Sequence, residues 1–525
     1  MQPEWLKFKK YPHIGTPLTN STDRVWVEQY VTNPDNIIKH KFTPLLHRVI
    51  TQRKFRPDDS SCKNASGKRV RVAKEPKKRH IYFPSHLDSI IYSYYNSILT
   101  KAYETYLSDK DYSAVAVAYR KIPKNNNAAG NKCNIDFAAD AFKFIIDNKH
   151  RKLSVIVADI TSFFDNLDPR LLHNQWKKVI VVDDMPLDHY KIYKNLVDFK
   201  YVNENELFNR FKNRLIVQRY KDNDTNSMVL KRKHVSKFYN IRRENVVAFC
   251  DKVEFFRNAL DLIKVDKPFN NLIRKERGKP NKKGIPQGTP ISATLANIYM
   301  LDFDARIYEE VSVPSRQAYY QRYSDDIIIV CNQEDEEYFY NLLLTEIEQK
   351  AKLDIQKNKT HVYRYELGED GTLKGGIVKD KVICSNRQLE YLGFTFDGNK
   401  VRVKTSGFSK FYRNMKHSFK RGVYFAKKAH IPSNSLFERR LYKRFTHVGA
   451  RRRLKWIADS SSPTGYRRTT MYDWGNFISY LNKADAVMND INKGNNISRQ
   501  SRKIWKKFHE IKKKAYKEIA RYQDK

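Results

Sequence analysis

The sequence predicts an α+β protein with a strand-rich centre between helical flanks. Strand signals, which are short β-branched and aliphatic runs bounded by turn residues, cluster between residues 150 and 405. Helical periodicity dominates on either side, and residues 407–525 are basic and helical with few strand signals. This order of segments is typical of an α+β centre that carries helical flanks.

The charge balance points to a polyanionic partner. The 525 residues include 100 lysines and arginines against 58 aspartates and glutamates, a formal net charge of +42. With 40% hydrophobic and 13% aromatic residues, the chain can bury a sizeable core and does not have the composition of a disordered protein. The excess of positive charge therefore predicts binding to nucleic acid or to an acidic membrane surface.

Cysteine usage and hydropathy indicate the compartment. The five cysteines are widely spaced and form no C-x-x-C pair, which disfavours a disulfide framework and a zinc ribbon. The first residues lack the apolar segment of a signal peptide, and no run approaches the ~18 apolar residues that span a bilayer. We therefore expect a cytoplasmic protein with no membrane partner.

Local patterns predict the elements in chain order. Residues 1–60 indicate helices and loops, and a loop is expected over residues 60–80. Apolar residues at helical spacing predict a helix over 81–107, whereas the β-branched run at 153–160 predicts a buried strand. From about 170 to 280 the chain is predicted to be mostly helical.

Aspartates stand at the ends of two predicted central strands. Asp159 directly follows an apolar run, and Asp325 and Asp326 fall between an aromatic segment and the aliphatic run 327–330, as in a tight hairpin turn. Adjacent carboxylates repel each other, and removing them from water beside a hydrophobic strand is costly. A divalent cation would offset both penalties, and hard oxygen ligands suit Mg²⁺.

A third carboxylate from another strand would complete a two-metal site for nucleotidyl transfer. One ion would activate a 3′-hydroxyl, and the other would stabilise the leaving pyrophosphate. A bare Tyr-x-Asp-Asp also occurs as an ordinary exposed turn, at a rate of roughly one such chain in ten. The flanking strands, the second acidic strand end and the positive charge favour the polymerase interpretation.

The segment 282–304 is rich in turn residues and then in small residues. Gly284, Pro286, Gly288 and Pro290 predict a rigid turn whose backbone can approach a ligand closely. An ordinary loop before a helix has the same composition, and this interpretation would be preferred without the accompanying motifs.

Taken together, five motifs resemble motifs A to E of reverse transcriptases. In chain order they are ADITSFFDNL, GIPQGTPISATLANIYM, YSDD, LDIQKNKT and LEYLGF. The resemblance covers about residues 70–400, and its order and spacing make it specific. It implies a right-hand polymerase with fingers, a ferredoxin-like palm and a helical thumb, and the activity of an RNA-directed DNA polymerase, which is a nucleotidyltransferase.

Motifs A and C supply the catalytic residues that the resemblance implies. By position, Asp159, Asp325 and Asp326 match the metal-binding aspartates, which would hold two Mg²⁺ ions. Phe164 matches the aromatic steric gate that excludes a ribose 2′-hydroxyl, so dNTPs are the expected substrates. Phe163 is expected to pack in the core.

The remaining motifs imply further contacts with the nucleotide. Gln287 matches the motif B glutamine near the incoming nucleotide and template, and Lys359 matches the motif D lysine that protonates the pyrophosphate leaving group. Arg79 resembles the basic residue of the fingers that contacts the triphosphate. Lys77 and Lys78 compete with Arg79 for this role.

Motif E implies a primer grip centred on Tyr391, Leu392 and Gly393. The primer itself is left open between RNA, DNA and a protein hydroxyl, for which Tyr516 and Tyr522 are conceivable.

The resemblance also divides the chain. Residues 1–70 form an N-terminal helical and loop region, and residues 71–400 form the fingers and palm. Because the gap between motifs A and B is long, an insertion is expected near 180–270. Residues 401–525 are assigned to the helical thumb and a basic C-terminal extension.

Further details are similar to the bacterial abortive-infection and defence-associated reverse transcriptases, which are related to group II intron and retron enzymes. These are SAVAVAYRK at 113–121 and CNIDFAADAF at 133–142. The similarity implies cDNA synthesis on an RNA template, antiphage defence and a structured non-coding RNA as partner. The alternatives are a mobile-element reverse transcriptase and a non-catalytic, maturase-like RNA-binding scaffold.

The last segment, residues 498–525, has an amphipathic pattern. Its apolar stripe consists of Ile504, Phe508, Ile511, Ala515 and Ile519. Two interpretations have equal weight: a cationic surface that contacts RNA, and a helix packed on the body with a solvated basic face.

Overall fold

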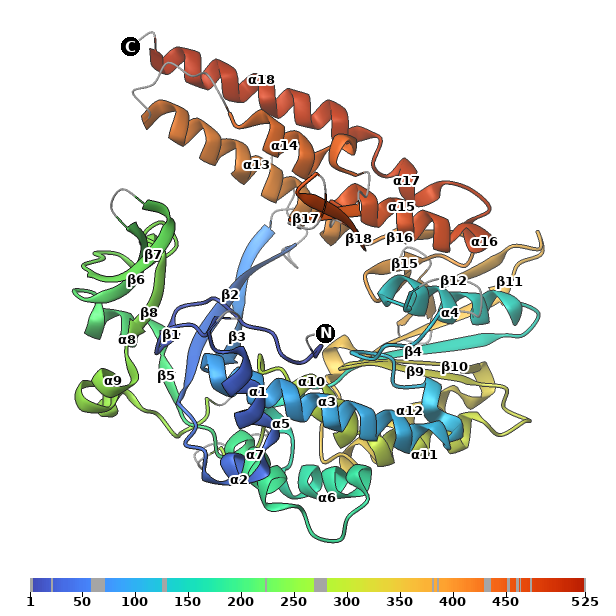
Figure 1. Ribbon diagram of the computed structural model, residues 1–525. Helices are drawn as coiled ribbons and strands as arrows, with labels where there is room; N and C mark the ends of the chain where they lie inside the picture. The colour runs from blue at the N-terminus through green and yellow to red at the C-terminus, as the bar shows by residue number, and fades with distance from the viewer. Residues whose placement is uncertain are drawn as a thin grey trace. The chain divides into compact units, whose positions relative to one another are not determined.

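The structure is a computed structural model of the chain. It describes residues 3–19, 22–57, 71–124, 130–221, 224–268, 281–379, 382–384, 387–428, 436–450, 454–458, 462, 464–472 and 475–523. The contacts divide the chain into two units, each of which is described by itself. The first unit consists of Met1–Tyr119, Ile160–Tyr308 and Leu342–Gln356, and the second of Arg120–Asp159, Glu309–Asn341 and Lys357–Lys525. Figure 1 shows the course of the chain through the elements of each unit.

The first unit contains two sheets. One has the order β3-β2-β5 and the other the order β1-β8-β6-β7. Their strands are β1 (His13–Ile14), β2 (Leu45–Pro57), β3 (Arg71–Phe83), β5 (Tyr201–Asn203), β6 (Leu215–Lys221), β7 (Asp224–Lys233) and β8 (Val246–Cys250).

These strands correct three expectations from the sequence. Residues 45–57 form β2, whereas the sequence predicts helices and loops over residues 1–60. The loop expected over residues 60–80 is wrong from residue 71 onward, because β3 pairs with β2 in a long antiparallel hairpin; residues 60–70 lie outside the described residues. The mostly helical prediction for 170–280 is wrong where β5 to β8 occur. In the middle of the β2–β3 hairpin Val49 is 38% exposed and Ile50 49% exposed, so backbone pairing holds the strands there without the buried face that produces an alternating pattern.

Helices make up the rest of the first unit. Those described are α1 (Arg24–Thr32), α2 (Pro34–Lys39), α3 (His86–Ser108), α5 (Phe163–Asn166), α6 (Pro169–Ile180), α7 (Leu187–Val197), α8 (Glu204–Phe211), α9 (Lys252–Asn258) and α10 (Ser292–Tyr299). Helices α11 (Leu301–Val311) and α12 (Glu336–Gln349) each have residues in both units. The helix predicted over 81–107 is α3, which begins five residues later because residues 81–83 complete β3.

A six-stranded antiparallel sheet is the centre of the second unit. Its order is β13-β12-β11-β4-β10-β9, so β4 lies inside the sheet between β10 and β11. The strands are β4 (Leu153–Asp159), β9 (Tyr319–Tyr323), β10 (Asp326–Asn332), β11 (His361–Leu367), β12 (Leu373–Lys379) and β13 (Val382–Cys384). The buried strand predicted at 153–160 is confirmed, and it ends at Asp159.

Helix α4 (Asn134–Asp147) packs on this sheet. Its Phe142 and Ile145 share one core with Val155 of β4 and Ile328 of β10, and all four side chains are fully buried. The helix begins with a capping box in which the Asp136 carboxylate accepts a hydrogen bond from the Cys133 backbone N–H, at 2.8 Å.

Helices dominate the C-terminal part of the second unit, which also holds a small sheet and a hairpin. The helices are α13 (Thr405–Lys428), α14 (Glu438–Phe445), α15 (Phe477–Val487), α16 (Asn489–Asn492), α17 (Asn496–Arg499) and α18 (Lys503–Gln523). The sheet consists of β14 (Leu389–Tyr391), β15 (Phe394–Phe396) and β16 (Val401–Val403), and the hairpin of β17 (Leu454–Ala458) and β18 (Tyr466–Tyr472).

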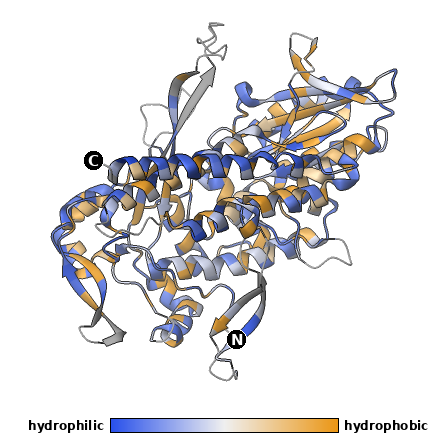
Figure 2. Ribbon diagram, turned by 90° about the horizontal axis from the view of Figure 1, so that it is seen from above, coloured by the Kyte–Doolittle hydropathy of each residue, from blue (hydrophilic) through white to orange (hydrophobic). Residues whose placement is uncertain are grey.

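The predicted apolar stripe of the last helix is packed against its neighbours. Ile504, Phe508, Ala515 and Ile519 of α18 are buried in a core to which α13 and α14 also contribute, and Ile511 is partly buried there. Hydrophilic residues cover much of the face of α18 that Figure 2 presents. The helix is therefore a packed amphipathic helix with a solvated basic face.

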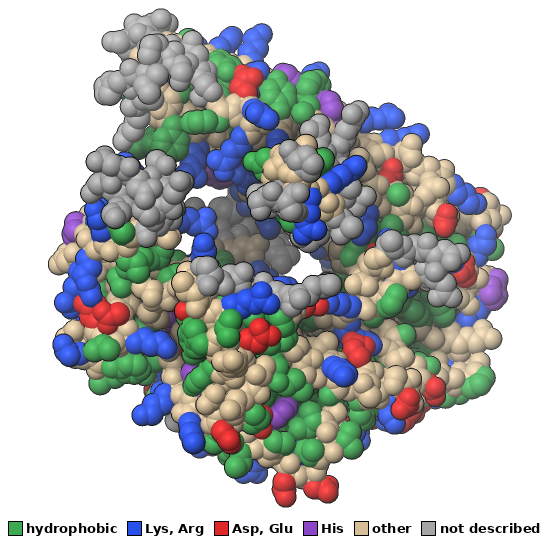
Figure 3. Space-filling model, in the orientation of Figure 1, with side chains coloured by type: hydrophobic (Ala, Val, Ile, Leu, Met, Phe, Trp, Pro, Cys, Tyr) green, Lys and Arg blue, Asp and Glu red, His purple; other side chains and the backbone are tan. Residues whose placement is uncertain are grey.

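Lysine and arginine side chains are spread over the face of the molecule drawn in Figure 3.

Among the described residues, no helix combines the length and the hydropathy that a membrane crossing requires. The α+β class predicted from the sequence is confirmed.

Two side-chain amides complete the edge of the small sheet. The Val401 N–H donates to Asn492 Oδ1 at 2.7 Å, and Asn492 Nδ2 donates to the Val401 carbonyl at 3.2 Å. Gln500 forms the same pair with Val403, at 2.9 and 3.2 Å. Asn492 and Gln500 therefore occupy the hydrogen-bonding positions of a further strand, which leaves this edge of β16 covered.

Asn492→Ala should destabilise the protein by about 1–3 kcal/mol, since it leaves a buried N–H and carbonyl of Val401 unpaired. Urea unfolding measures this loss. Asn489→Ala, on the exposed side of the same helix, is the matched control. Equal losses in the two variants would mean that the amide contacts to β16 contribute nothing.

Candidate active site

A tight hairpin turn carries two of the predicted aspartates. Strands β9 and β10 pair so that Tyr323 is opposite Asp326, which leaves Ser324 and Asp325 as the turn and Asp326 as the first residue of β10. Ser324 has a φ of 61°, in the left-handed region that two-residue hairpin turns require. The fully buried Arg322 donates from Nη1 to the Ser324 carbonyl at 3.1 Å and so supports the turn from below.

The third aspartate lies across the sheet from this turn. Asp159 ends β4, and the antiparallel register places it directly opposite Asp326 of β10. Directly opposed residues have Cβ atoms about 4.5–5.5 Å apart, and like charges in such pairs are destabilising. The fold thus holds two carboxylates against their mutual repulsion, with Asp325 next in the chain.

Burial and crowding both disfavour the charged form of Asp326. Burial, followed by the negative charges of Asp325 and Asp159, raises the pKa of Asp326 to about 7, and the cations Lys359 and Lys404 only partly offset these effects. The Lys359 ammonium lies 2.6 Å from Asp159 Oδ2, so one carboxylate of the group is already paired with a cation.

The donor set fits a hard divalent cation. Within the described ranges, no group of three or more His, Cys, Asp or Glu side chains is gathered closely enough to hold a metal ion, and here Lys359 lies beside Asp159. The carboxylates nevertheless offer only oxygen donors, and their repulsion is the penalty that a cation relieves. Asp159, Asp325 and Asp326 are the residues that would hold it, with the Lys359 ammonium displaced from Asp159.

The predicted primer-grip residues form a second turn in the same unit. Leu392 and Gly393 connect β14 to β15, and both have positive φ, at 44° and 92°. Tyr391 is 2% exposed, and its hydroxyl donates to Gln321 Oε1 at 2.9 Å. Because Gln321 belongs to β9, this bond ties the turn between β14 and β15 to the strand that leads into the aspartate turn.

The steric-gate candidate lies in the first unit. Phe163 is buried in α5 and Phe164 is partly exposed. The Phe164 carbonyl accepts a hydrogen bond from the Ile285 N–H at 2.9 Å, which docks the Gly/Pro segment onto α5. A Cβ at Gly284 would lie 2.5 Å from the Asp165 carbonyl oxygen, so this close approach requires glycine.

The same segment is bonded to β3 at its other end. The Gln287 carbonyl accepts from the Tyr82 N–H at 2.8 Å, while the Gln287 side chain is partly exposed. Arg79, three residues before Tyr82, is exposed on β3 opposite Ile50. Arg79, Phe164 and Gln287 thus belong to the first unit, and the three aspartates, Lys359 and the residues from Tyr391 to Gly393 belong to the second.

Lys267 is a buried cation that sequence reasoning missed. Its ammonium donates to the carbonyls of Lys283 and Gly284, each at 3.0 Å, and so holds the start of the Gly/Pro segment. Burial lowers the pKa of Lys267 to about 8. Nothing in its local sequence distinguishes it from the many exposed lysines, because only the tertiary fold brings those carbonyls together. The supporting Arg322 and Gln321 were missed for the same reason.

Part of the chain matches a known protein family. Residues 191–396 match the family described as "Reverse transcriptase (RNA-dependent DNA polymerase)". This segment, less than half of the chain, is therefore similar to a reverse transcriptase domain, and the fold class predicted from the sequence, an α+β right-hand polymerase, is confirmed. The matched segment includes Gln287, Asp325, Asp326 and Lys359 and begins after Asp159.

Two telomerase structures are similar to the chain. Apo telomerase from Candida tropicalis, truncated from the C-terminal domain, has 10% identity and a TM-score of 0.36, over 74% of this chain and 61% of that chain. Telomerase from Candida albicans in complex with a TWJ fragment of telomeric RNA has 12% identity and a TM-score of 0.36, over 95% of this chain and 68% of that one. The chain thus spans less than two thirds of the first of these. No match was found among curated proteins.

Asp326→Asn should stabilise the metal-free protein by roughly 1–2 kcal/mol at pH 8, because it removes a charge that burial and two carboxylates oppose. The pKa of Asp326 is about 7 in the folded state against an ordinary value of 3.8, so the folded state binds more protons between these values. Wild-type stability in EDTA should therefore fall as the pH rises from about 4 to 7, and this slope should be smaller in the variant.

Chemical unfolding at pH 5 and pH 8 measures both effects. Addition of Mg²⁺ should stabilise the wild type more than Asp326→Asn. A variant that is less stable than the wild type at pH 8 in EDTA would contradict the view that Asp326 is held against repulsion.

Proposed function

We propose that this protein is an RNA-directed DNA polymerase that synthesises cDNA from dNTPs on an RNA template. The observation that carries the proposal is the register of β4 and β10, which sets Asp159 opposite Asp326 beside the Asp325 turn. The reverse transcriptase match over residues 191–396 supports the same activity. The polymerase chemistry requires carboxylates in this kind of arrangement.

Asp159, Asp325 and Asp326 are proposed to hold two Mg²⁺ ions. When bound, the ions would supply charge neutralisation for the triphosphate and activation of the primer 3′-hydroxyl. In the reaction the 3′-oxygen forms a bond to the α-phosphorus of the dNTP, and the bond from that phosphorus to the pyrophosphate oxygen breaks. Lys359, released from Asp159, is proposed to donate a proton to the leaving pyrophosphate.

The remaining motif residues are proposed to select and position the substrates. Phe164 would exclude a ribose 2′-hydroxyl, Gln287 would contact the incoming nucleotide and template, and Arg79 would contact the triphosphate. The turn at Leu392 and Gly393 would support the primer end, with Tyr391 as its buried anchor rather than a contact to the primer, because its hydroxyl is bonded to Gln321.

The proposed biological role is antiphage defence in the bacterial cytoplasm, together with a structured non-coding RNA. Its support is the similarity of residues 113–121 and 133–142 to defence-associated reverse transcriptases. Purification from the native locus, followed by sequencing of the bound RNA and DNA, tests this role. One abundant small RNA is the expected result, whereas an intron RNA would support a mobile-element enzyme instead.

Asp325→Asn should abolish dNTP incorporation on a primed RNA template while leaving RNA affinity within about twofold, because it removes a metal ligand and not a cationic contact. Primer extension and filter binding measure the two quantities. Asp147→Asn, at the exposed end of α4, makes the same charge change away from the site and should extend normally. Incorporation at the wild-type rate by Asp325→Asn would remove the basis for the proposed site.

Lys359→Ala should slow nucleotide incorporation by about 10²-fold or more if Lys359 acts as a general acid. Lys359→Arg separates two roles, since arginine can pair with Asp159 but holds its proton too tightly to donate it. Single-turnover incorporation should be slow in both variants. Recovery to the wild-type rate in Lys359→Arg would show that Lys359 contributes only the ion pair.

A further inference from the structure

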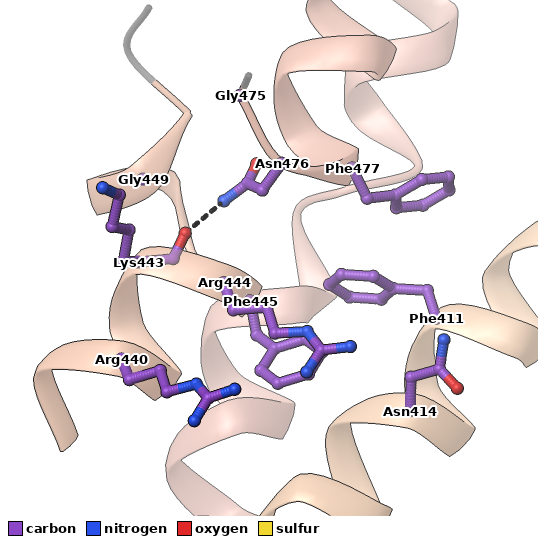
Figure 4. Close-up of a pocket in the computed structure, with 10 residues that line it drawn as sticks. All are labelled: Phe411, Asn414, Arg440, Lys443, Arg444, Phe445, Gly449, Gly475, Asn476 and Phe477. Atoms are coloured by element: carbon purple, nitrogen blue, oxygen red, sulfur yellow. Dashed lines mark hydrogen bonds between the residues drawn. The ribbon is translucent and has the colours of Figure 1, made fainter. Parts of the chain in front are cut away.

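The C-terminal helices of the second unit enclose a pocket, called here the α14 pocket. Its volume is about 460 Å³, within the range of roughly 300–1,000 Å³ that holds small ligands. It is formed by α13, α14, the start of α15 and the segments that flank them (Figure 4). The lining residues are Phe411, Asn414, Arg440, Lys443, Arg444, Phe445, Gly449, Gly475, Asn476 and Phe477.

One side of the α14 pocket is cationic. Arg440, Lys443 and Arg444 are spaced i, i+3 and i+4 on α14, so they lie on one face of the helix, and all three are exposed. Among the described residues, no acidic side chain lines the pocket and none of these three cations forms an ion pair. The nearby carboxylate of Glu438 is instead paired with Lys512 at 2.7 Å.

Three like charges within about one helical turn repel each other. A bound anion would offset this repulsion. The pocket therefore has the electrostatic character of a phosphate site.

The floor of the pocket is aromatic. Phe411 and Phe477 stack with ring centroids 4.9 Å apart and an angle of 27°, and Figure 4 shows them pointing toward each other from α13 and α15. Phe445 contacts Phe411 edge-to-face at 5.7 Å, and the Arg444 guanidinium lies 5.2 Å from the Phe445 ring centroid. Phe411 and Phe445 are buried, whereas Phe477 is partly exposed. An inorganic anion would gain nothing from the Phe477 ring, whereas a nucleobase could pack against its exposed part.

The remaining wall of the pocket is held in place by hydrogen bonds from a side-chain amide to backbone carbonyls and by one close approach of the backbone. Asn476 Nδ2 donates to the carbonyls of Lys443 and Thr446, at 3.1 and 2.6 Å, and so joins the start of α15 to the end of α14. A Cβ at Gly449 would lie 1.7 Å from the Lys443 carbonyl oxygen, so the chain can pass this close only as glycine. The cations and rings are thus presented by a fixed frame.

We propose that the α14 pocket binds one unpaired nucleotide of a single-stranded RNA. Its phosphate would lie against Arg440, Lys443 and Arg444, and its base against the partly exposed ring of Phe477. Phe445 and Phe411 are 2% and 7% exposed and support this ring from the core. Cationic contacts to the backbone combined with base stacking on aromatic side chains are the general means of holding single strands. The inference rests on the proposed function only in taking RNA as the partner.

Arg440→Gln/Arg444→Gln tests the pocket in the full-length protein. The probe is a fluorescent twelve-nucleotide single-stranded RNA, titrated by anisotropy at several salt concentrations. Affinity should fall about tenfold or more, and the slope of log K against log salt should become shallower by about 0.7, since one phosphate is held by these side chains and each phosphate contact on a single strand contributes about 0.7. Arg413→Gln/Arg439→Gln is the matched control. Arg413 is exposed on α13 and Arg439 is exposed on α14, two of the helices that form the pocket, and neither residue lines it.

A second measurement uses only the wild-type protein, so its result does not depend on whether the variants fold. The wild-type protein is cross-linked to the same RNA carrying 5-iodouridine, and the modified peptides are mapped. A cross-link is expected at Phe477. AMP should compete for the cross-link, whereas inorganic phosphate at equal ionic strength should compete less, which separates a nucleotide site from a bare phosphate site.

Three results would overturn the proposal: equal losses in the pocket and control variants, cross-links that avoid Phe477, or stronger competition by a phosphopeptide than by AMP. Primer extension by the wild-type protein tests the proposed polymerase function separately, so failure of one does not imply failure of the other.

Discussion

The antiparallel register of β4 and β10 is the constraint on which the candidate site depends. It sets Asp159 opposite Asp326, and the turn before β10 adds Asp325. The hydrogen bonds between the two strands and the burial of their aliphatic residues offset the repulsion between these carboxylates. Carboxylates that the fold holds close together are well suited to bind cations, because a bound cation removes the repulsion between them.

Several contacts within the second unit support this register. Arg322 holds the aspartate turn by its backbone, and the bond from Tyr391 to Gln321 joins the small sheet to the adjacent strand. Asn492 and Gln500 in turn complete the outer edge of that small sheet. A continuous set of hydrogen bonds and packed strands thus runs from the C-terminal helices to the catalytic candidates. The α14 pocket belongs to the same unit, so the proposed RNA contact and the carboxylates are parts of one compact body.

The parts of the fold that sequence could predict are those in which burial leaves a periodic pattern. The strand at 153–160 is apolar throughout because it lies inside a sheet, and the stripe of α18 is apolar because it is buried against α13. The middle of the β2–β3 hairpin was not predicted because its side chains are largely charged or exposed, and its pairing is made by backbone groups that are the same in every residue. Strands β5, β6 and β8 are mostly apolar and buried but short, and the periodicity of a short apolar run does not distinguish a strand from a buried helix.

By itself, the sequence determined which aspartates stand at strand ends, where the glycine- and proline-rich segment lies and which family the motifs resemble. These are local properties, set by residue type and spacing. Only the tertiary structure decided that Asp159 faces Asp326, that Lys359 pairs with Asp159, that Tyr391 is buried and that Lys267 is held by carbonyls. Each of these depends on strand register or on contacts between segments far apart in the chain, and neither is encoded in a local pattern.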